Sequence, residues 1–365
     1  MWDFPTSMRP VRQRLVAIAL VVLAVVAGFA GGYLARGPSG SATTGTPTLA
    51  VIAAGSLAPI LPGILATFAD ETPGVAAPIA AQLYEGSSAA AVALTLPGAP
   101  YDLFVAADFR TIPSLSEPPH ASVTGWEAVF ASDPLVLAYA PGAGALAGID
   151  STNWFVVLER PGVVLGVPNA SVDPLGANAI FALELADALA HQNGSLYGHF
   201  FSNPEGALAT PTANAKYVAE NVAETALSTG EVNAYLLYRS YAVANHLSYV
   251  TLNSSVDLGA IDPASVAAYS SARTTVLSGS GSSVLAGAPI LFALTVPSAA
   301  PQYGLGVAAA AYLLSNATAA AWAANGFAPL APILTDRPAA LPGALAGTAP
   351  DGVAPLPSYL AALLA

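Results

Sequence analysis

Cysteine is absent from this chain of 365 residues, and lysine occurs once, at Lys216. Without cysteine, the chain has neither a disulfide framework nor a thiolate metal site. Charged side chains make up 9% of the residues, and acidic ones outnumber basic ones by 22 to 10, which gives a formal net charge of −12. This charge argues against binding to nucleic acids and to anionic membrane surfaces.

The chain also has no Gly-x-Ser-x-Gly elbow and no His-Glu-x-x-His motif, and its four histidines lack metal-ligand spacing. We therefore expect a protein that is not an enzyme, although paired carboxylates could serve as an acid and a base. A cell-surface structural glycoprotein is a second alternative. It is suggested by sequons at Asn169, Asn193, Asn253 and Asn316, but it predicts internal repeats, which the sequence does not contain.

One segment, from Leu15 to Ala35, is apolar, uncharged and long enough to span a bilayer, and arginines precede it. We interpret residues 1–36 as a signal or anchor helix. No clean small-x-small cleavage site follows, and no cysteine is available for a lipoprotein anchor, so we expect the helix to be retained. By the positive-inside rule, the rest of the chain then lies outside the cell, so we expect an extracellular protein that is anchored at the cell surface or secreted. Residues 37–47 are a flexible Gly/Ser/Thr/Pro linker.

Three buried strands after the linker each end in a turn that leads towards a helix. These strands are expected at Thr48–Ala53, Val75–Leu83 and Tyr101–Ala106. The first two turns end in Gly-Ser, at Ser56 and Ser87, and Ser88 follows directly. Carboxyl ends of parallel strands meet at one edge of a sheet, where ligands gather in open α/β folds. The pattern therefore predicts an α/β fold with ligand-binding groups along one edge.

A carboxylate occupies a similar junction further along the chain. The segment Val167–Gly176 joins an apolar strand, Gly162–Val167, to an alanine-rich helix, Ala177–Ala190. Pro174 suits the first turn of a helix, which puts Asp173 at the N-cap position. This position is compatible with a plain helix cap and with a ligand contact.

The remaining pattern indicates a second lobe and a return to the first. We expect a crossing strand at Val136–Tyr139, a helix at Thr212–Thr229, strands at Val232–Tyr238 and Tyr249–Leu252, a returning strand at Pro289–Val296 and a helix at Leu305–Ser315. The first lobe is assigned to residues 48–137 and 258–335, the second to 138–257, and a Pro/Ala-rich tail to 336–365.

From about Leu49 to Ala320, the chain resembles the archaeal tungstate/molybdate-binding proteins of ABC uptake systems. The resemblance is carried by Ala54-Gly-Ser56, Glu85-Gly-Ser87, Asp102–Phe109, Phe130–Tyr139, Asp173-Pro-Leu-Gly176 and Tyr238-Arg-Ser240, in this order. It implies a two-lobed type II periplasmic-binding-protein fold. Each lobe would be a mostly parallel sheet flanked by helices, with the ligand in the cleft between them.

The resemblance further implies a monomeric extracellular solute-binding protein that needs no cofactor and delivers tungstate or molybdate to an ABC permease. Two carboxylates that coordinate the metal centre map onto Asp173 and Glu220, with Glu224 as the alternative to Glu220. The other oxyanion-binding groups would be Ser56, Ser87, Ser88 and Tyr238. Mo(VI) and W(VI) are hard centres that accept extra oxygen ligands, whereas carboxylates repel sulfate. Sulfate or phosphate remains an alternative ligand, because fold alone does not choose among oxyanions.

Overall fold

The computed structural model describes residues 48–73, 81–118, 120, 122–190, 195–278, 281–348 and 351–364. The expected anchor helix (1–36) and linker (37–47) lie outside these residues. Within the described ranges, no single helix has the length and hydropathy to cross a membrane. Helices α11 (Tyr303–Leu313) and α12 (Asn316–Ala324) reach that threshold only as a pair, and a bend of 64° separates them.

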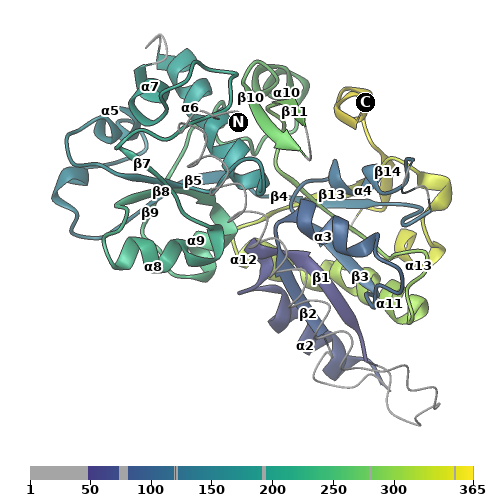
Figure 1. Ribbon diagram of the computed structural model, residues 1–365. Helices are drawn as coiled ribbons and strands as arrows, with labels where there is room; N and C mark the ends of the chain where they lie inside the picture. Colours follow the sequence, from purple (N-terminus) through teal and green to yellow (C-terminus); the bar gives the residue numbers. More distant parts are fainter. Residues whose placement is uncertain are drawn as a thin grey trace, which may run out of the picture. The chain divides into compact units, whose positions relative to one another are not determined.

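The first lobe is built on a seven-stranded sheet in the order β14-β13-β4-β12-β3-β1-β2 (Figure 1). Its strands are β1 (Ala50–Ala54), β2 (Ala81–Glu85), β3 (Leu103–Ala106), β4 (Ala128–Ser132), β12 (Leu291–Thr295), β13 (Ala328–Thr335) and β14 (Val353–Pro355). All residues of β1, β3, β4 and β12 are buried, as expected for strands that are covered on both faces.

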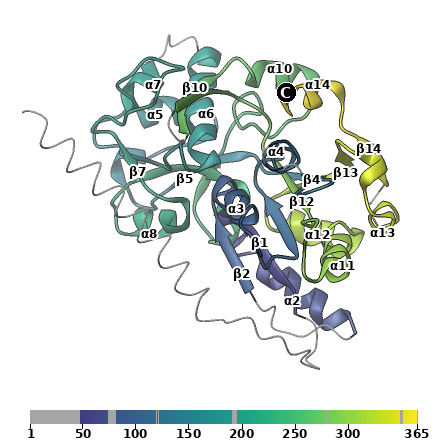
Figure 2. The same cartoon turned by 45° about the vertical axis from the view of Figure 1, so that its right-hand side comes forward.

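Helices cover both faces of this sheet (Figure 2). On one face, α2 (Leu61–Glu71) and α11 contribute buried leucines and Phe68 to the larger apolar core. The other face is covered by α3 (Ser87–Leu94), α4 (Thr111–Ser114), α10 (Pro263–Tyr269) and α14 (Ser358–Ala361). The carboxyl ends of β1 and β2 lead directly into the short helix η2 (Gly55–Leu57) and α3, which positions their first residues at the edge of the sheet.

The second lobe has a five-stranded sheet in the order β7-β6-β8-β5-β9. Its strands are β5 (Leu135–Tyr139), β6 (Leu165–Val167), β7 (Ala215–Tyr217), β8 (Ala234–Tyr238) and β9 (Tyr249–Thr251). The helices of this lobe are α5 (Trp154–Leu158), α6 (Pro174–Ala190), α7 (Ser195–Phe200), α8 (Ala223–Ser228) and α9 (Arg239–Ala244). Of these, α6 is buried from Leu175 to Asp187 and packs against β5, β6 and β8.

The predicted two-lobed α/β architecture is confirmed, but both sheets are mixed. The chain leaves the first sheet at β4 and enters the second as β5, which runs antiparallel to β8 and β9. It returns as β12, antiparallel to both β3 and β4. The crossings therefore place antiparallel strands within sheets that were expected to be mostly parallel. All of β5 belongs to the second sheet, so the lobe boundary lies at Asp133 and Pro134, before the expected boundary at residue 137.

Two further segments differ from their expected assignments. Residues 336–365 do not form a separate tail, because β14 pairs with β13 and Leu360 of α14 is buried in the first lobe. The hairpin of β10 (Arg273–Ser278) and β11 (Gly281–Ala286), assigned from sequence to the first lobe, packs on α6 of the second. There, the Glu184 carboxylate accepts a hydrogen bond of 2.8 Å from the backbone N–H of Arg273.

The helix expected at Thr212–Thr229 is wrong over its first half. This segment consists of β7, the short helix η4 (Glu220–Val222) and α8. Residues 215–217 pair in parallel with β6, and the backbone N–H of Val218 donates to the carbonyl of Val167. Pairing with a strand distant in sequence thus outweighs the local preference for helix.

Candidate functional site

Two serines follow the carboxyl ends of β1 and β2. Ser56 is completely buried in η2, and its hydroxyl oxygen has no hydrogen-bond partner among the described residues. Ser87 begins α3, and its hydroxyl oxygen accepts a hydrogen bond of 2.9 Å from the backbone N–H of Ala107. The O–H of Ser87 is thereby left to donate. A buried hydroxyl without a partner is costly, so a ligand oxygen would stabilise Ser56 in particular.

Asp173 has the predicted position just before α6. Its Oδ1 accepts a hydrogen bond of 2.9 Å from the backbone N–H of Leu175. The turn is compact, because a Cβ on Gly176 would lie 2.6 Å from the backbone N of Ala170. Asp173 is partly exposed but densely surrounded, and desolvation raises the pKa of its carboxyl to about 6 despite the Leu175 hydrogen bond. Asp173 is therefore a helix cap with one oxygen left for another contact.

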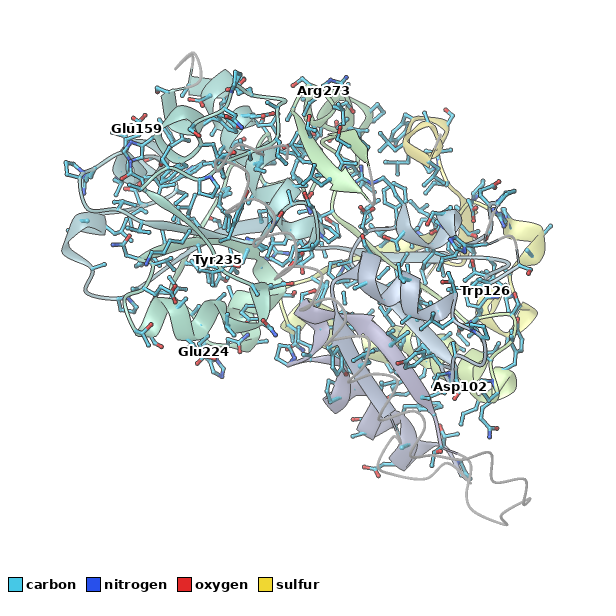
Figure 3. All side chains as sticks on the ribbon, viewed as in Figure 1. Asp102, Trp126, Glu159, Glu224, Tyr235 and Arg273 are labelled. Atoms are coloured by element: carbon cyan, nitrogen blue, oxygen red, sulfur yellow. The ribbon has the colours of Figure 1, made fainter. Side chains whose placement is uncertain are left out.

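Glu220 is a buried carboxylate within electrostatic range of Asp173. It begins η4, the residue is 7% exposed, and its Oε1 has no partner among the described residues. Burial raises its pKa well above the ordinary value, and the nearby carboxylates of Asp173 and Asp133 raise it further. The alternative, Glu224, is exposed on the outer side of α8 (Figure 3). The structure thus brings Glu220, and not Glu224, towards Asp173.

Tyr238 ends β8 beside these carboxylates. It is buried, and its hydroxyl oxygen accepts a hydrogen bond of 3.4 Å from Nδ2 of Asn178. Burial and the proximity of Glu220 and Asp173 raise the pKa of the Tyr238 phenol, so its O–H stays available as a donor. Sequence analysis missed Asn178, although it is the one polar side chain in the first ten residues of α6, which is a recognisable signal.

The two sets of groups approach each other where the lobes touch. A Cβ on Gly86 of the first lobe would lie 2.9 Å from the carbonyl oxygen of Val172 in the second. Helix η2 also contacts η4 and α9. These contacts place five candidate residues around one region between the lobes: Ser56, Ser87, Asp173, Glu220 and Tyr238. The remaining candidate, Ser88, is exposed and lines a cavity next to this region.

That cavity has a volume of about 870 Å³. Its walls come from α3, α4, the loop before α6, the β10–β11 hairpin and residues 362–363. Asp173 lines it, and so does an ion pair that sequence analysis missed, Arg110 with Asp108, in which Nη2 lies 2.8 Å from Oδ2. The Asp-x-Arg spacing of this pair overlaps the end of the Asp102–Phe109 segment and could have indicated it.

Asp133 is a second missed carboxylate, buried at the crossing between the lobes. It accepts hydrogen bonds from the backbone N–H of Ser240, at 3.1 Å, and from the Ser240 hydroxyl. Desolvation raises the pKa of Asp133 to about 7, although the Ser240 donors oppose the shift. This carboxyl joins the start of α9 to the interlobe crossing.

The acidic pair of Asp173 and Glu220 suits a metal centre that arrives with its own oxygens. Among the described residues, no group of three or more His, Asp or Glu side chains could hold a metal ion. A bare cation such as Ca²⁺ would need more oxygen ligands than two carboxylates supply. Within the part of the chain that the structure describes, no arginine or lysine is among the groups that shift the pKa of Asp173 or Glu220. Hydroxyl donors and two carboxylates therefore define this region.

Comparison with known proteins places the chain in a family. Residues 49–328 match the family model of the bacterial extracellular solute-binding proteins. Over 232 residues, the chain is 29% identical to an uncharacterized solute-binding protein of Methanoculleus marisnigri, and the match covers 59% of this chain and 63% of that protein. It is 25% identical over 272 residues to the molybdate/tungstate-binding protein WtpA of Pyrococcus abyssi, covering 70% of this chain and 72% of the relative.

Solved structures agree on the fold. The periplasmic molybdate-binding protein of Azotobacter vinelandii has a TM-score of 0.52 at 16% identity and covers 76% of this chain and 98% of its own. The sulfate-binding protein SubI of Mycobacterium tuberculosis has the same TM-score and identity, 0.52 and 16%, with coverages of 87% and 96%. The expected solute-binding class is confirmed at the level of the family. The chain belongs to the bacterial extracellular solute-binding protein family.

Proposed function

We propose that this protein captures tungstate or molybdate between its lobes and delivers the oxyanion, as a monomer, to an ABC permease. We further propose that the apolar segment from Leu15 to Ala35 tethers it to the membrane beside that permease. One observation carries the choice of ligand. Oε1 of Glu220 is buried without a partner among the described residues, Asp173 is a second carboxylate near it, and no arginine or lysine of the described part lowers the pKa of either group.

Such a pair is unfavourable for most anions, because it would repel sulfate or phosphate. Molybdate and tungstate differ, since their metal centres accept further oxygen ligands, which Asp173 and Glu220 can supply. The oxo groups would accept hydrogen bonds from the hydroxyls of Ser56, Ser87 and Tyr238, with Ser88 at the side of the cavity. Ser56 and Glu220 would then acquire the partners that they lack in the protein alone.

The relationship to the Pyrococcus abyssi molybdate/tungstate-binding protein supports this ligand class. The fold by itself does not select it, because the molybdate-binding and sulfate-binding structures resemble this chain equally, with TM-scores of 0.52. Sulfate or phosphate therefore remains the alternative that a titration must decide.

The test is calorimetric titration of the full-length protein with tungstate, molybdate, sulfate and phosphate, supported by thermal melts. A ligand present at about a hundred times its dissociation constant stabilises the folded state by about 2.7 kcal/mol. We expect such stabilisation with tungstate and molybdate. If sulfate or phosphate stabilised the protein instead, that anion would be the ligand in place of tungstate or molybdate. If none of the four anions had an effect, oxyanion capture would be refuted.

The substitution Glu220→Gln tests the role of the second carboxylate, with Glu224→Gln as its matched control. Loss of a buried charged contact should weaken tungstate binding by on the order of 100-fold. The exposed Glu224 should tolerate the same change. If Glu220→Gln bound tungstate like the wild type, or if Glu224→Gln lost binding, the assignment of Glu220 would be wrong.

A further inference from the structure

Arg110 provides the one guanidinium among the described residues that line the cavity beside Asp173. Its Nε lies 3.0 and 3.2 Å from the two carboxylate oxygens of Asp108, and its Nη2 lies 2.8 Å from Oδ2. Its Nη1 donates to the carbonyl of Ala286 in β11 at 3.3 Å. The guanidinium is therefore held on one side by a carboxylate and on the other by the hairpin.

Asp108 is fixed in this arrangement by the backbone. Its Oδ1 also accepts a hydrogen bond of 2.9 Å from the backbone N–H of Arg110, so the carboxylate and the guanidinium share one local turn. The side chains of Arg110 and Asp108 are 25% and 18% exposed, which places the pair in the cavity wall and in contact with solvent. To an approaching anion, the pair presents a dipole and no net positive charge.

The pair is also within electrostatic range of the proposed oxyanion site. Asp108 is the main cause of the raised pKa of Arg110, and Tyr238 adds to it; burial is the main cause of the raised pKa of Tyr238, and Asp108 adds to it. An unpaired guanidinium at this position would form charge-assisted hydrogen bonds with any tetrahedral dianion, sulfate as readily as molybdate. Coordination by Asp173 and Glu220, in contrast, is open only to the metal centres of molybdate and tungstate.

We propose that Asp108 is a specificity-determining residue that withholds the Arg110 guanidinium from bound anions, and so leaves selection to the two coordinating carboxylates. The proposal rests on the proposed function for its biological meaning. Its physical content, the masking of one cation by one carboxylate, can be measured with sulfate alone.

The experiment titrates sulfate and molybdate into full-length wild type, Asp108→Asn, Asp108→Ser and the double variant Asp108→Asn/Arg110→Gln at low ionic strength. Asn and Ser both retain the ability to cap the turn but carry no charge. Asp262→Asn is the matched control. Asp262 caps α10 by accepting hydrogen bonds from the backbone N–H groups of Ala264 and Ser265, and it does not line the cavity.

We expect Asp108→Asn to bind sulfate about 10-fold or more tightly than the wild type, as one new charge-assisted contact would provide. The gain should shrink with added salt, because the pair is partly exposed. It should disappear in the double variant and be absent from Asp262→Asn. If Asp108→Asn does not fold, Asp108→Ser decides by the same criterion.

Unchanged sulfate affinity in the folded Asp108 variants, or a gain that persists after Arg110 is replaced, would overturn the proposal. The wild-type titration with molybdate and tungstate judges the proposed function separately. If the wild type binds neither ligand, the function is wrong, while the sulfate titrations still decide whether Asp108 masks Arg110.

Discussion

Alanine in place of Gly86 is expected to weaken ligand binding while leaving the ligand-free fold intact. Gly86 lies between β2 and α3 with φ of −55° and ψ of 137°, a conformation that alanine adopts without strain. The obstacle is across the lobe contact, where the new Cβ would lie 2.9 Å from the carbonyl oxygen of Val172. The substitution thus penalises only the arrangement in which the lobes touch.

The size of the effect follows from the geometry. A separation of 2.9 Å is about half an ångström shorter than ordinary contact, and the obstacle is backbone, which cannot rotate away as a side chain can. Overpacking of this kind costs about 1–3 kcal/mol. If that cost applies to the closed state alone, the dissociation constant should rise by about 5- to 150-fold.

The assay compares tungstate affinity by calorimetry with the melting temperature of the ligand-free protein. Gly125→Ala is the control, because a Cβ there would have no atom within 4 Å. Gly86→Ala should lose affinity at an unchanged melting temperature, and Gly125→Ala should change neither. If Gly86→Ala bound tungstate within about 2-fold of the wild-type affinity, the expected loss would be absent. Gly86 and Val172 would then not be in contact in the bound state. A lowered melting temperature would locate the defect in folding instead.

Three other changes are expected to have distinct signatures. Gly176→Ala places a Cβ 2.6 Å from the backbone N of Ala170 within one lobe, so it should lower unfolding free energy by about 1–3 kcal/mol with or without ligand, as measured by urea denaturation. Asn178→Leu removes the donor to Tyr238 and should weaken tungstate binding several-fold; a double-mutant cycle with Tyr238→Phe checks this, since the combined loss should be less than additive. The ligand-free protein should lose stability as pH rises from about 4 to 7, because folding raises the pKa of Asp133 from 3.8 to about 7 and the folded state therefore holds an extra proton in that window. The contribution of Asp133 to the free energy of unfolding is on the order of 4 kcal/mol. Urea denaturation at several pH values should show a weaker pH dependence of stability for Asp133→Asn than for the wild type. An unchanged pH dependence would contradict this account.

Local sequence was sufficient for the elements whose chemistry is local. The Gly-Ser turns at Ser56 and Ser87 and the cap at Asp173 depend on residues next to one another, and the structure places all three at the start of a helix. A buried strand followed by a helix repeats along the chain, and that repetition was enough to predict an α/β fold.

The second carboxylate could not be chosen in this way. Glu220 and Glu224 are four residues apart, and on the expected helix both would lie on one face. In the structure, residues 215–217 form β7 and pair with β6, so no helix starts at Thr212. Glu220 is buried, whereas Glu224 is exposed. The difference between Glu220 and Glu224 therefore depends on the pairing of β6 with β7, two strands that are far apart in the sequence.

The sequence by itself determined the approximate positions of several strands and which serines and which aspartate lie at helix starts, because these depend on neighbouring residues and on apolar periodicity. The two-lobed fold was implied by the resemblance to a known family. Tertiary structure decided which side chains share the interlobe region. Asn178 donates to Tyr238, the backbone N–H of Ser240 donates to Asp133, and Arg110 donates to Ala286, and the two residues of each pair lie 60, 107 and 176 positions apart in the sequence. Burial and the proximity of like charges, which shift the pKa values of these groups, arise from that packing and have no counterpart in the local sequence.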